Sequence, residues 1–442
     1  MSGKKQVFIV GLDPDNKERL ESLPHGKECE FHPALTYDEI RDGETFEIED
    51  LIRCATERME AHWRVDAVAS YWDFPGSTLA AVLAERFGLP GPSLEAVLKC
   101  EHKYWSRLEQ RKVIPDNIPR FRPFDPWDDE AYERLDLLPP FWIKPIKSFR
   151  SFLASQITGP RHFEEVVSLC REKGDSMTAP FLYLMRTYGM PPEISEMRET
   201  FIAESALGGF LCTLEGYSAE GRVAIYGIVD SVPEPDSSSF ARYEYPSCLP
   251  LEIQHRMMDV ARLAIEQIGY DQGPFNVEFF YDQTGGRVWL LEINPRISES
   301  HADLFEKVHG CSHQGIMLDL ALGRMPRPLE RKGAYTIAAK FMLRTFEQGK
   351  VTRVPSPAAI RKLGQRQPGT IVKSLVRPGQ QLSDLARQDM YSYEIANVFI
   401  GGRDQSDLFD KYDEALAVLQ FDIEKEPEKV PLCGKPLREN AP

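Results

Sequence analysis

The sequence predicts an α/β protein that is divided into about three domains. Its 442 residues suggest that number at roughly 150 residues for each domain. Strand-like and helix-like segments alternate over about the first 95 residues, which is typical of a parallel α/β unit. Later strands follow one another across glycine-containing turns, so we expect an α+β core and a strand-rich C-terminal part.

The composition makes several classes of protein poor fits. Hydrophobic residues make up 42% of the chain and charged residues 27%, as in an ordinary globular protein. The net charge is −15 and no basic run interrupts the chain, so no nucleic-acid partner and no membrane partner is expected. The N-terminal apolar run is too short for a signal peptide, and no stretch approaches the ~20 apolar residues that span a bilayer. The eight cysteines are scattered without a CxxC pair, which favours reduced thiols and a cytoplasmic protein.

The order of elements follows from hydrophobic periodicity and turn signals. The chain begins with an apolar strand at 6–11 and a turn at Asp13-Pro14-Asp15. The further elements that we expect are a strand at 65–72, a helix at 77–88 with a Ser N-cap and a terminal Gly88, a helix at 93–113, a strand at 141–146, a helix at 161–174, a meander of strands at 201–231, an amphipathic helix at 251–269 and a last helix near 405–420.

Two strands, FNVEFFY and VWLLEIN, are joined by DQTGGR and should form a hairpin. We expect a five-residue loop at 283–287, in which two glycines supply the unusual backbone angles. The pairs that this loop predicts are Asp282 with Val288, Phe280 with Leu290, and Glu278 with Glu292. Alternation along the strands then puts Glu278, Glu292 and Asn294 on one face, with Trp289, Leu291 and Ile293 behind them.

Two facing carboxylates in mostly apolar strands require an explanation, because like charges directly opposite each other are destabilising. Carboxylate and amide oxygens suit a hard divalent cation, Mg²⁺ or Mn²⁺ in its place, which also takes substrate phosphates as ligands. Arg296 could then hold a phosphate or a developing oxyanion. The alternative is a solvated hairpin face with Arg296 in a surface ion pair.

The segments NVEFF and LLEINPRIS together resemble the metal-binding end of the ATP-grasp superfamily, which includes D-alanine–D-alanine ligase, biotin carboxylase and amino-acid ligases. The resemblance implies that Glu278 and Glu292 bridge one or two Mg²⁺ ions and that Asn294 completes the metal shell. It also implies that Arg296 is the catalytic residue that supports the reacting phosphoryl or acyl group.

The resemblance extends upstream to the residues that would bind ATP. Lys103 and Lys144 resemble the two nucleotide-contacting lysines, and Glu204 resembles the hinge acid near the adenine or ribose. Any one of these lysines alone is more often a solvated side chain. Where the family usually has a Gly- and Ser-rich loop over the phosphates, this chain has KSFRSFL, in which Lys147 and Arg150 could replace backbone amides. The same departure fits a chain whose ATP binding is weakened or lost.

The resemblance also implies the domain boundaries. Residues 1–98 resemble the α/β domain that precedes the grasp core, 99–330 the core with a lid subdomain at about 135–205, and 331–442 a C-terminal accessory domain. Motif-level support is confined to roughly 100–301. A homodimer is expected only because the proteins that the chain resembles commonly form dimers.

The activity that the resemblance implies is an ATP-dependent ligase that activates a carboxylate as an acyl phosphate and joins it to an amine, both substrates being small molecules such as amino acids. Arg242, Ser300 and His301 are the expected substrate residues, with Tyr245 beside them. A solvent-facing His301 at a helix start is the alternative that we slightly favour for that residue. The alternatives for the whole chain are a carboxylase that acts through carboxyphosphate and a catalytically silent ATP-binding protein. SESHADLFE does not match the biotin carboxylase signature EHxVTE, which ranks the carboxylase lower.

Overall fold

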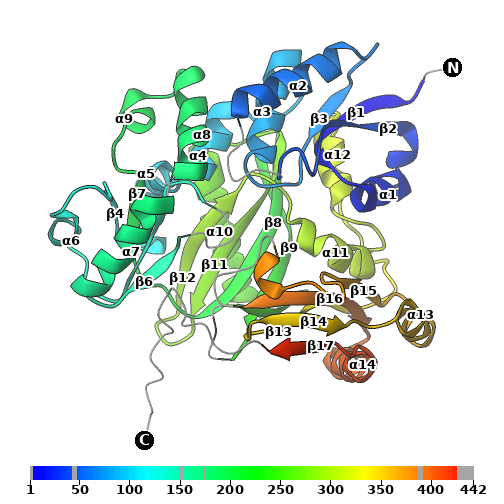
Figure 1. The fold of residues 1–442 in the computed structure, drawn as a ribbon. Coiled ribbons are helices and arrows are strands. Elements are labelled where there is room, and N and C mark those ends of the chain that lie inside the picture. The colour runs from blue at the N-terminus through cyan, green and yellow to red at the C-terminus, as the bar shows by residue number, and fades with distance from the viewer. Residues whose placement is uncertain are drawn as a thin grey trace, which may run out of the picture.

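The computed structural model describes residues 3–41, 47–148, 153–173, 175–235, 237, 239–385 and 392–425. Its strands form a three-stranded sheet, a four-stranded sheet, an eight-stranded sheet and a two-stranded ribbon (Figure 1). No helix in these ranges combines the length and the apolar character that crossing a bilayer needs. The seven cysteines that lie in them are free thiols.

The N-terminal unit is a parallel sheet with helices around it, which confirms the prediction for this part of the chain. The strand order is β2-β1-β3, and β1 pairs in parallel with both neighbours. Its elements are β1 (Lys5–Leu12), α1 (Pro14–Ser22), β2 (Cys29–Thr36), α2 (Ile48–Glu60), β3 (Ala67–Ala69) and α3 (Gly76–Phe87). The expected N-cap of α3 is wrong: Pro75 occupies the cap, and the Ser77 hydroxyl donates to the Glu101 carboxylate instead.

Helix α3 ends as predicted at Gly88, which adopts left-handed backbone angles of φ 61° and ψ 36°. A Cβ added at Gly88 would meet no atom within 4 Å, so an alanine there would carry only the conformational cost. We expect Gly88→Ala to lower the free energy of unfolding by about 1 kcal/mol in urea titrations. Gly159→Ala is the matched control, because that site is equally open and does not lie in the left-handed region. Equal effects of the two substitutions would contradict the conformational explanation.

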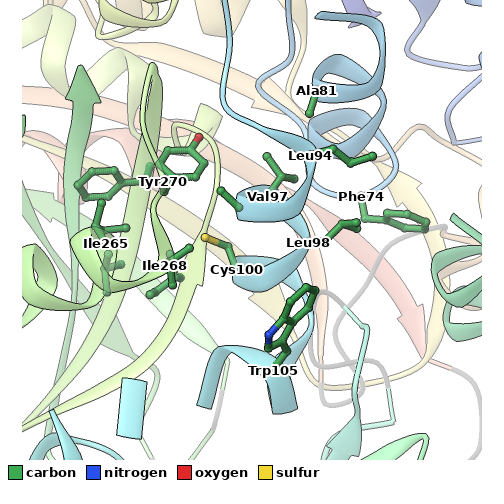
Figure 2. Close-up of a cluster of buried hydrophobic side chains, with 14 of the residues drawn as sticks. Phe74, Ala81, Leu94, Val97, Leu98, Cys100, Trp105, Ile265, Ile268 and Tyr270 are labelled. Atoms are coloured by element: carbon green, nitrogen blue, oxygen red, sulfur yellow. The ribbon is translucent and has the colours of Figure 1, made fainter. Parts of the chain in front are cut away.

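The predicted helix at 93–113 is two helices, α4 (Leu94–Glu101) and α5 (Lys103–Val113). His102 interrupts them with extended angles of φ −84° and ψ 99°, and its Nδ1 accepts a hydrogen bond from the backbone N–H of Trp105. No glycine or proline signals this break, so periodicity alone misses it. The buried side chains of α4 lie between those of α3 and those around α10 in Figure 2. This packing fixes Lys103 at the start of α5.

The smaller, four-stranded sheet has the order β4-β7-β5-β6; its strands β5, β6 and β7 lie within the range of about 135–205 that was expected for a lid, and β4 lies before it. The elements of this sheet and its surroundings are β4 (Phe121–Phe124), α6 (Ala131–Arg134), β5 (Phe141–Pro145), β6 (Ser155–Ile157), α7 (Pro160–Lys173), α8 (Asp175–Thr187), α9 (Pro192–Ser195) and β7 (Phe201–Ser205). The sequence predicts one meander over 201–231, but β7 belongs to this sheet while the next two strands belong to the main one.

The main sheet has eight strands in the order β12-β11-β8-β9-β10-β13-β16-β15, and its neighbours are antiparallel. Its strands are β8 (Phe210–Ala219), β9 (Arg222–Pro233), β10 (Phe240–Tyr245), β11 (Gly273–Asp282), β12 (Arg287–Asn294), β13 (Ile337–Thr345), β15 (Ile371–Ser374) and β16 (Tyr393–Gly402). Its helices are α10 (Leu251–Ile268), α11 (Ala302–His309), α12 (Gln314–Ala321), α13 (Pro357–Arg366) and α14 (Gln405–Val418). The ribbon pairs β14 (Gly349–Arg353) with β17 (Asp422–Lys425). The sheet thus continues across the boundary expected at 331.

The two faces of the main sheet have different partners. Helix α10 packs against one face, where its Met257 contacts Cys212 of β8. Farther along the same face, α13 and α14 pack on the strands in a core that includes Phe341. On the other face, Phe305 of α11 packs on Tyr245, and the polar side chains of the β11–β12 hairpin project there. We call this second face the site face.

Candidate active site

The β11–β12 hairpin places Glu278 directly opposite Glu292, as predicted. The pairs nearer the turn are wrong in the prediction: Asp282 lies opposite Arg287, and Phe280 lies opposite Trp289. The loop is one residue shorter than expected, and a register shift between Glu278 and Phe279 absorbs the difference. Such a bulge also reverses the alternation. The buried residues of β12 are therefore Val288, Leu290 and Ile293, while Trp289 and Leu291 are half-buried.

The facing carboxylates have unequal surroundings. Burial and then the neighbouring Glu292 raise the pKa of Glu278 to about 7. Burial acts in the same direction on Glu292, but Lys103, Lys144 and Lys147 together outweigh it and lower the pKa of that carboxyl. Lys103 Nζ donates to Glu292 Oε1 at 2.7 Å and to the carbonyl of Ser148 at 2.9 Å. One carboxyl of the pair is compensated by a cation and the other is not.

Asn294 completes the row on the site face. Its Nδ2 donates to Glu278 Oε1 at 3.3 Å and to Asn276 Oδ1 at 2.9 Å. Among the described residues, no group of three His, Cys, Asp or Glu side chains is placed to hold a metal. Glu278, Glu292 and the amide of Asn294 are therefore the oxygen donors that the chain itself offers at this point.

Glu204 lies in a buried group of charges on β7. Arg107 Nε and Lys144 Nζ each approach its carboxylate to 2.6 Å, and its side chain is 5% exposed. Burial alone would raise the pKa of Glu204, but Arg107 and Lys144 together lower it to about 2. Arg107 also donates to the carbonyl of Leu291 at 2.7 Å, so it joins α5, β7 and β12. Arg107 was not among the predicted site residues, although it follows Lys103 by one helical turn of α5.

Two further predicted cations are also paired with carboxylates. Lys147 Nζ lies 3.0 Å from Glu101 and within 5.6 Å of the ring centres of Phe74 and Phe181. Arg296 pairs at 2.7 Å with Asp73, which comes from the turn after β3 in the N-terminal unit. Nothing in the spacing of the sequence signals Glu101 or Asp73, because both partners arrive from a separate part of the fold. The predicted Arg150 lies outside the described residues.

The structure separates the three expected substrate residues. Ser300 accepts a hydrogen bond from Lys340 at 3.2 Å beside the segment that follows Arg296. Arg242 instead donates to Glu244 at 3.0 Å, and its guanidinium lies 5.0 Å from the ring centre of Phe409 in α14. Because α14 covers the opposite face of the sheet, Arg242 lies away from the other residues predicted for the site. The neighbouring side chain on the site face is that of Tyr243.

His301 ends a short 3₁₀ turn, η3 (Glu299–His301), just before α11. The expectation of a solvent-facing side chain is wrong, because His301 is only 2% exposed. Its Nδ1 lies 2.8 Å from Oε1 of Glu215, a fully buried carboxyl of β8 that the sequence analysis missed. Tyr245, the other aromatic residue of the predicted substrate region, is bonded through its hydroxyl to His309 at 2.7 Å.

Comparison with known proteins identifies a domain within this arrangement. Residues 137–302 match the family model of the ATP-grasp domain. The carbamoyl phosphate synthase large chain of Streptomyces griseus is 28% identical over 156 residues, which are 32% of this chain and 13% of that one. Its counterpart in Clavibacter sepedonicus is 33% identical over 133 residues, or 29% of this chain and 12% of that one. The matches thus span only about an eighth of the length of these relatives.

Solved structures extend the likeness to nearly the whole chain. The L-amino acid ligase from Bacillus licheniformis has a TM-score of 0.71 at 17% identity, covering 96% of this chain and all of that one. The carboxyaminoimidazole ribonucleotide synthase from Aspergillus clavatus gives 0.64 at 14% identity, with 95% and 99% covered. The biotin carboxylase from Campylobacter jejuni gives 0.61 at 16% identity, with 95% and 92% covered. At these identities the likeness concerns the fold, and it confirms the predicted architecture.

Proposed function

We propose that this ATP-grasp protein is an ATP-dependent ligase that activates a small-molecule carboxylate as an acyl phosphate and joins it to an amine. Such a reaction requires a metal ion, a nucleotide and two substrates. The observation that carries the proposal is the pair of facing carboxylates, Glu278 and Glu292. Burial and mutual repulsion leave Glu278 uncompensated, and a bound cation would remove that repulsion.

The donor set fits magnesium. Glu278 and Glu292 supply carboxylate oxygens, and Asn294 would supply its Oδ1 because its Nδ2 already donates to Glu278. Two carboxylates and an amide leave positions for water and phosphate oxygens, as Mg²⁺ or Mn²⁺ prefers. When held by these residues, the ion would supply the positive charge that offsets the negative charge of the ATP phosphates during phosphoryl transfer.

The cations of the site would exchange partners when ATP binds. Lys103 is paired with Glu292 in the structure, and its ammonium group would be able to turn toward a phosphate if that carboxylate held a metal ion instead. Lys144 can contribute its charge from β5, where it is paired with Glu204. Arg296 is held beside the hairpin by Asp73, and its guanidinium is suited to the developing charge of the acyl phosphate.

Amino acids are the substrate class to test first, because the L-amino acid ligase from Bacillus licheniformis covers nearly the whole chain. ADP release should be measured with Mg·ATP across amino acids and hydroxy acids, each with and without an added amine. ADP release that requires an acid and yields an amide would support the ligase. ADP release with bicarbonate alone would replace it by a carboxylase, and bound ATP without any turnover would replace it by a silent binding protein.

Metal affinity is expected to depend on pH, because a proton and the metal compete for Glu278. Its pKa of about 7 lies above the ordinary 4.5, so the carboxyl holds a proton below neutral pH. Mg²⁺ affinity should therefore fall by up to about tenfold for each pH unit below 7 and level off above it. Calorimetric titration with Mg²⁺ between about pH 5.5 and about pH 8 measures this slope.

The variant Glu278→Gln supplies the control for that titration. It should bind Mg²⁺ more weakly and lose the slope, because no proton remains to be displaced. The same carboxyl should make the metal-free chain less stable as the pH rises from 4.5 to about 7, since the folded state binds more protons there. A flat affinity profile in the unsubstituted protein would contradict the assignment of Glu278 as a ligand.

A further inference from the structure

A buried carboxyl, Glu215, supports the segment that follows Arg296. Its Oε1 accepts a hydrogen bond from the backbone N–H of Ser298 at 3.2 Å and lies 2.8 Å from His301 Nδ1. Its side chain is 0% exposed, so these contacts take place away from water. A carboxyl–imidazole pair of this kind fixes the orientation of the ring and directs its other nitrogen.

The two nitrogens of His301 have different surroundings. Nδ1 faces Glu215, while Nε2 makes no hydrogen bond within the part of the chain that the structure describes. His102 and His313 also have a nitrogen without a partner, and in both that Nε2 is fully buried. His301 Nε2 is not among those fully buried atoms, so it contributes to the small surface that this residue exposes.

The pair lies beside the candidate metal site on the same face of the main sheet. Glu215 of β8 is in register with Asn276 of β11, and Asn276 is in register with Asn294 of β12. Adjacent strands are ~5 Å apart, so Glu215 lies roughly 10 Å from the predicted metal ligand Asn294. An acyl phosphate held at the metal ligands and an amine beside the imidazole would together span that separation.

We propose that His301 and Glu215 are the proton acceptor for capture of the acyl phosphate by the amine, an inference that rests on the proposed ligase function. His301 Nε2 would remove the proton from the attacking nitrogen, and Glu215 is a positioning residue that also takes up the proton through Nδ1. The nitrogen forms a bond to the acyl carbon while the bond from that carbon to the phosphate oxygen breaks. The electron pair of that bond leaves with the phosphate.

Burial disfavours the charged form of both members of the pair. Burial, followed by His313, Lys340 and Arg296, lowers the pKa of His301 well below its ordinary value. Burial raises the pKa of Glu215 well above its ordinary value, although Arg296 opposes this. His301 is therefore a neutral imidazole, and in the tautomer whose Nδ1 donates to Glu215 its Nε2 lone pair is available to accept a proton. Tyr226 also contacts this group, through a hydrogen bond at 3.3 Å to His313.

Hydroxylamine provides the test, because it is largely unprotonated near neutral pH and its attack product loses a proton to water without a base. With Mg·ATP and the acid that supports ADP release, His301→Gln should lower amide formation from an alkylamine by about 10²–10³-fold. Hydroxamate formation from hydroxylamine should change by less than about threefold, because the acyl phosphate still forms. Parallel loss of both products, or loss of neither, would overturn the proposal.

Two further variants separate chemistry from folding. Glu215→Gln keeps an oxygen that can accept a hydrogen bond from Nδ1 but cannot take up a proton. It should therefore show the same selective loss of amide formation. This variant decides the question if His301→Gln does not fold. His313→Gln removes a buried imidazole from the same cluster and should affect both products equally. A different result would contradict the proposed ligase function itself: no acid-dependent ADP release by the unsubstituted protein with either nucleophile.

Discussion

Replacing Glu292 by glutamine is expected to lower ADP formation by about a thousandfold. The substitution keeps the size of the side chain but removes the charge that would hold a metal ion and that now binds Lys103 at 2.7 Å. In phosphoryl transfer most of the acceleration comes from the positioning of phosphates by metal ions and cations. Steady-state ADP release with the acid substrate, at saturating Mg²⁺, is the measurement.

Lys103→Met is the matched comparison, because it breaks the same ion pair from the other side. If Glu292 is a metal ligand, Glu292→Gln should weaken Mg²⁺ binding, while Lys103→Met should retain it and weaken ATP binding. If the pair only stabilises the fold, the two variants should lose stability alike and neither should change metal affinity selectively. Wild-type ADP formation by Glu292→Gln would rule out the metal assignment.

The sequence predicts the position of the candidate metal site because the hairpin is local. Glu278 and Glu292 are separated by one short turn, and alternation of side chains decides which face they share. The prediction reaches the right pair although its intermediate pairs are wrong, since a shorter loop and a bulge compensate each other. The facing carboxylates follow from the sequence, but the path of the chain between them does not.

The partners of the predicted cations could not be found in the same way. Asp73 meets Arg296 only after the N-terminal unit has packed against the rest of the chain, and Glu101 at the end of α4 meets Lys147 only after that helix has packed beside β5. Glu215 is equally hidden, because a lone acid in a strand gives no sign that it will be fully buried. These contacts depend on tertiary packing, for which hydrophobic periodicity carries no information.

Two side chains in the predicted substrate region take directions that the sequence does not signal. Arg242 and Tyr243 are adjacent on a strand, so their side chains lie on opposite faces of the sheet, and only that of Tyr243 lies on the site face. His301 is at a helix start as foreseen, but a short 3₁₀ turn carries it inward toward Glu215. Placement of an element is therefore easier to predict than the direction of one side chain at its end.

Replacing Glu204 by glutamine is expected to lower the free energy of unfolding by about 3 kcal/mol at neutral pH. The substitution leaves the buried charges of Arg107 and Lys144, each now 2.6 Å from the carboxylate, without their counter-ion. A carboxyl with a pKa of about 2 in the folded chain and an ordinary value of 4.5 contributes roughly that much stability. Urea unfolding of the two proteins at neutral pH measures the difference.

The pH dependence of that difference identifies its cause. Because the folded pKa of Glu204 is depressed, its contribution is fully present above pH 4.5 and is lost as the pH falls toward about 2. The gap in stability between the unsubstituted chain and Glu204→Gln should therefore narrow within that window. Glu130→Gln, which removes one of the two acidic partners of the exposed Arg134, should leave the free energy of unfolding nearly unchanged. A gap for Glu204→Gln that stayed constant throughout acidification would mean that side-chain packing, rather than charge, is what the glutamine disturbs.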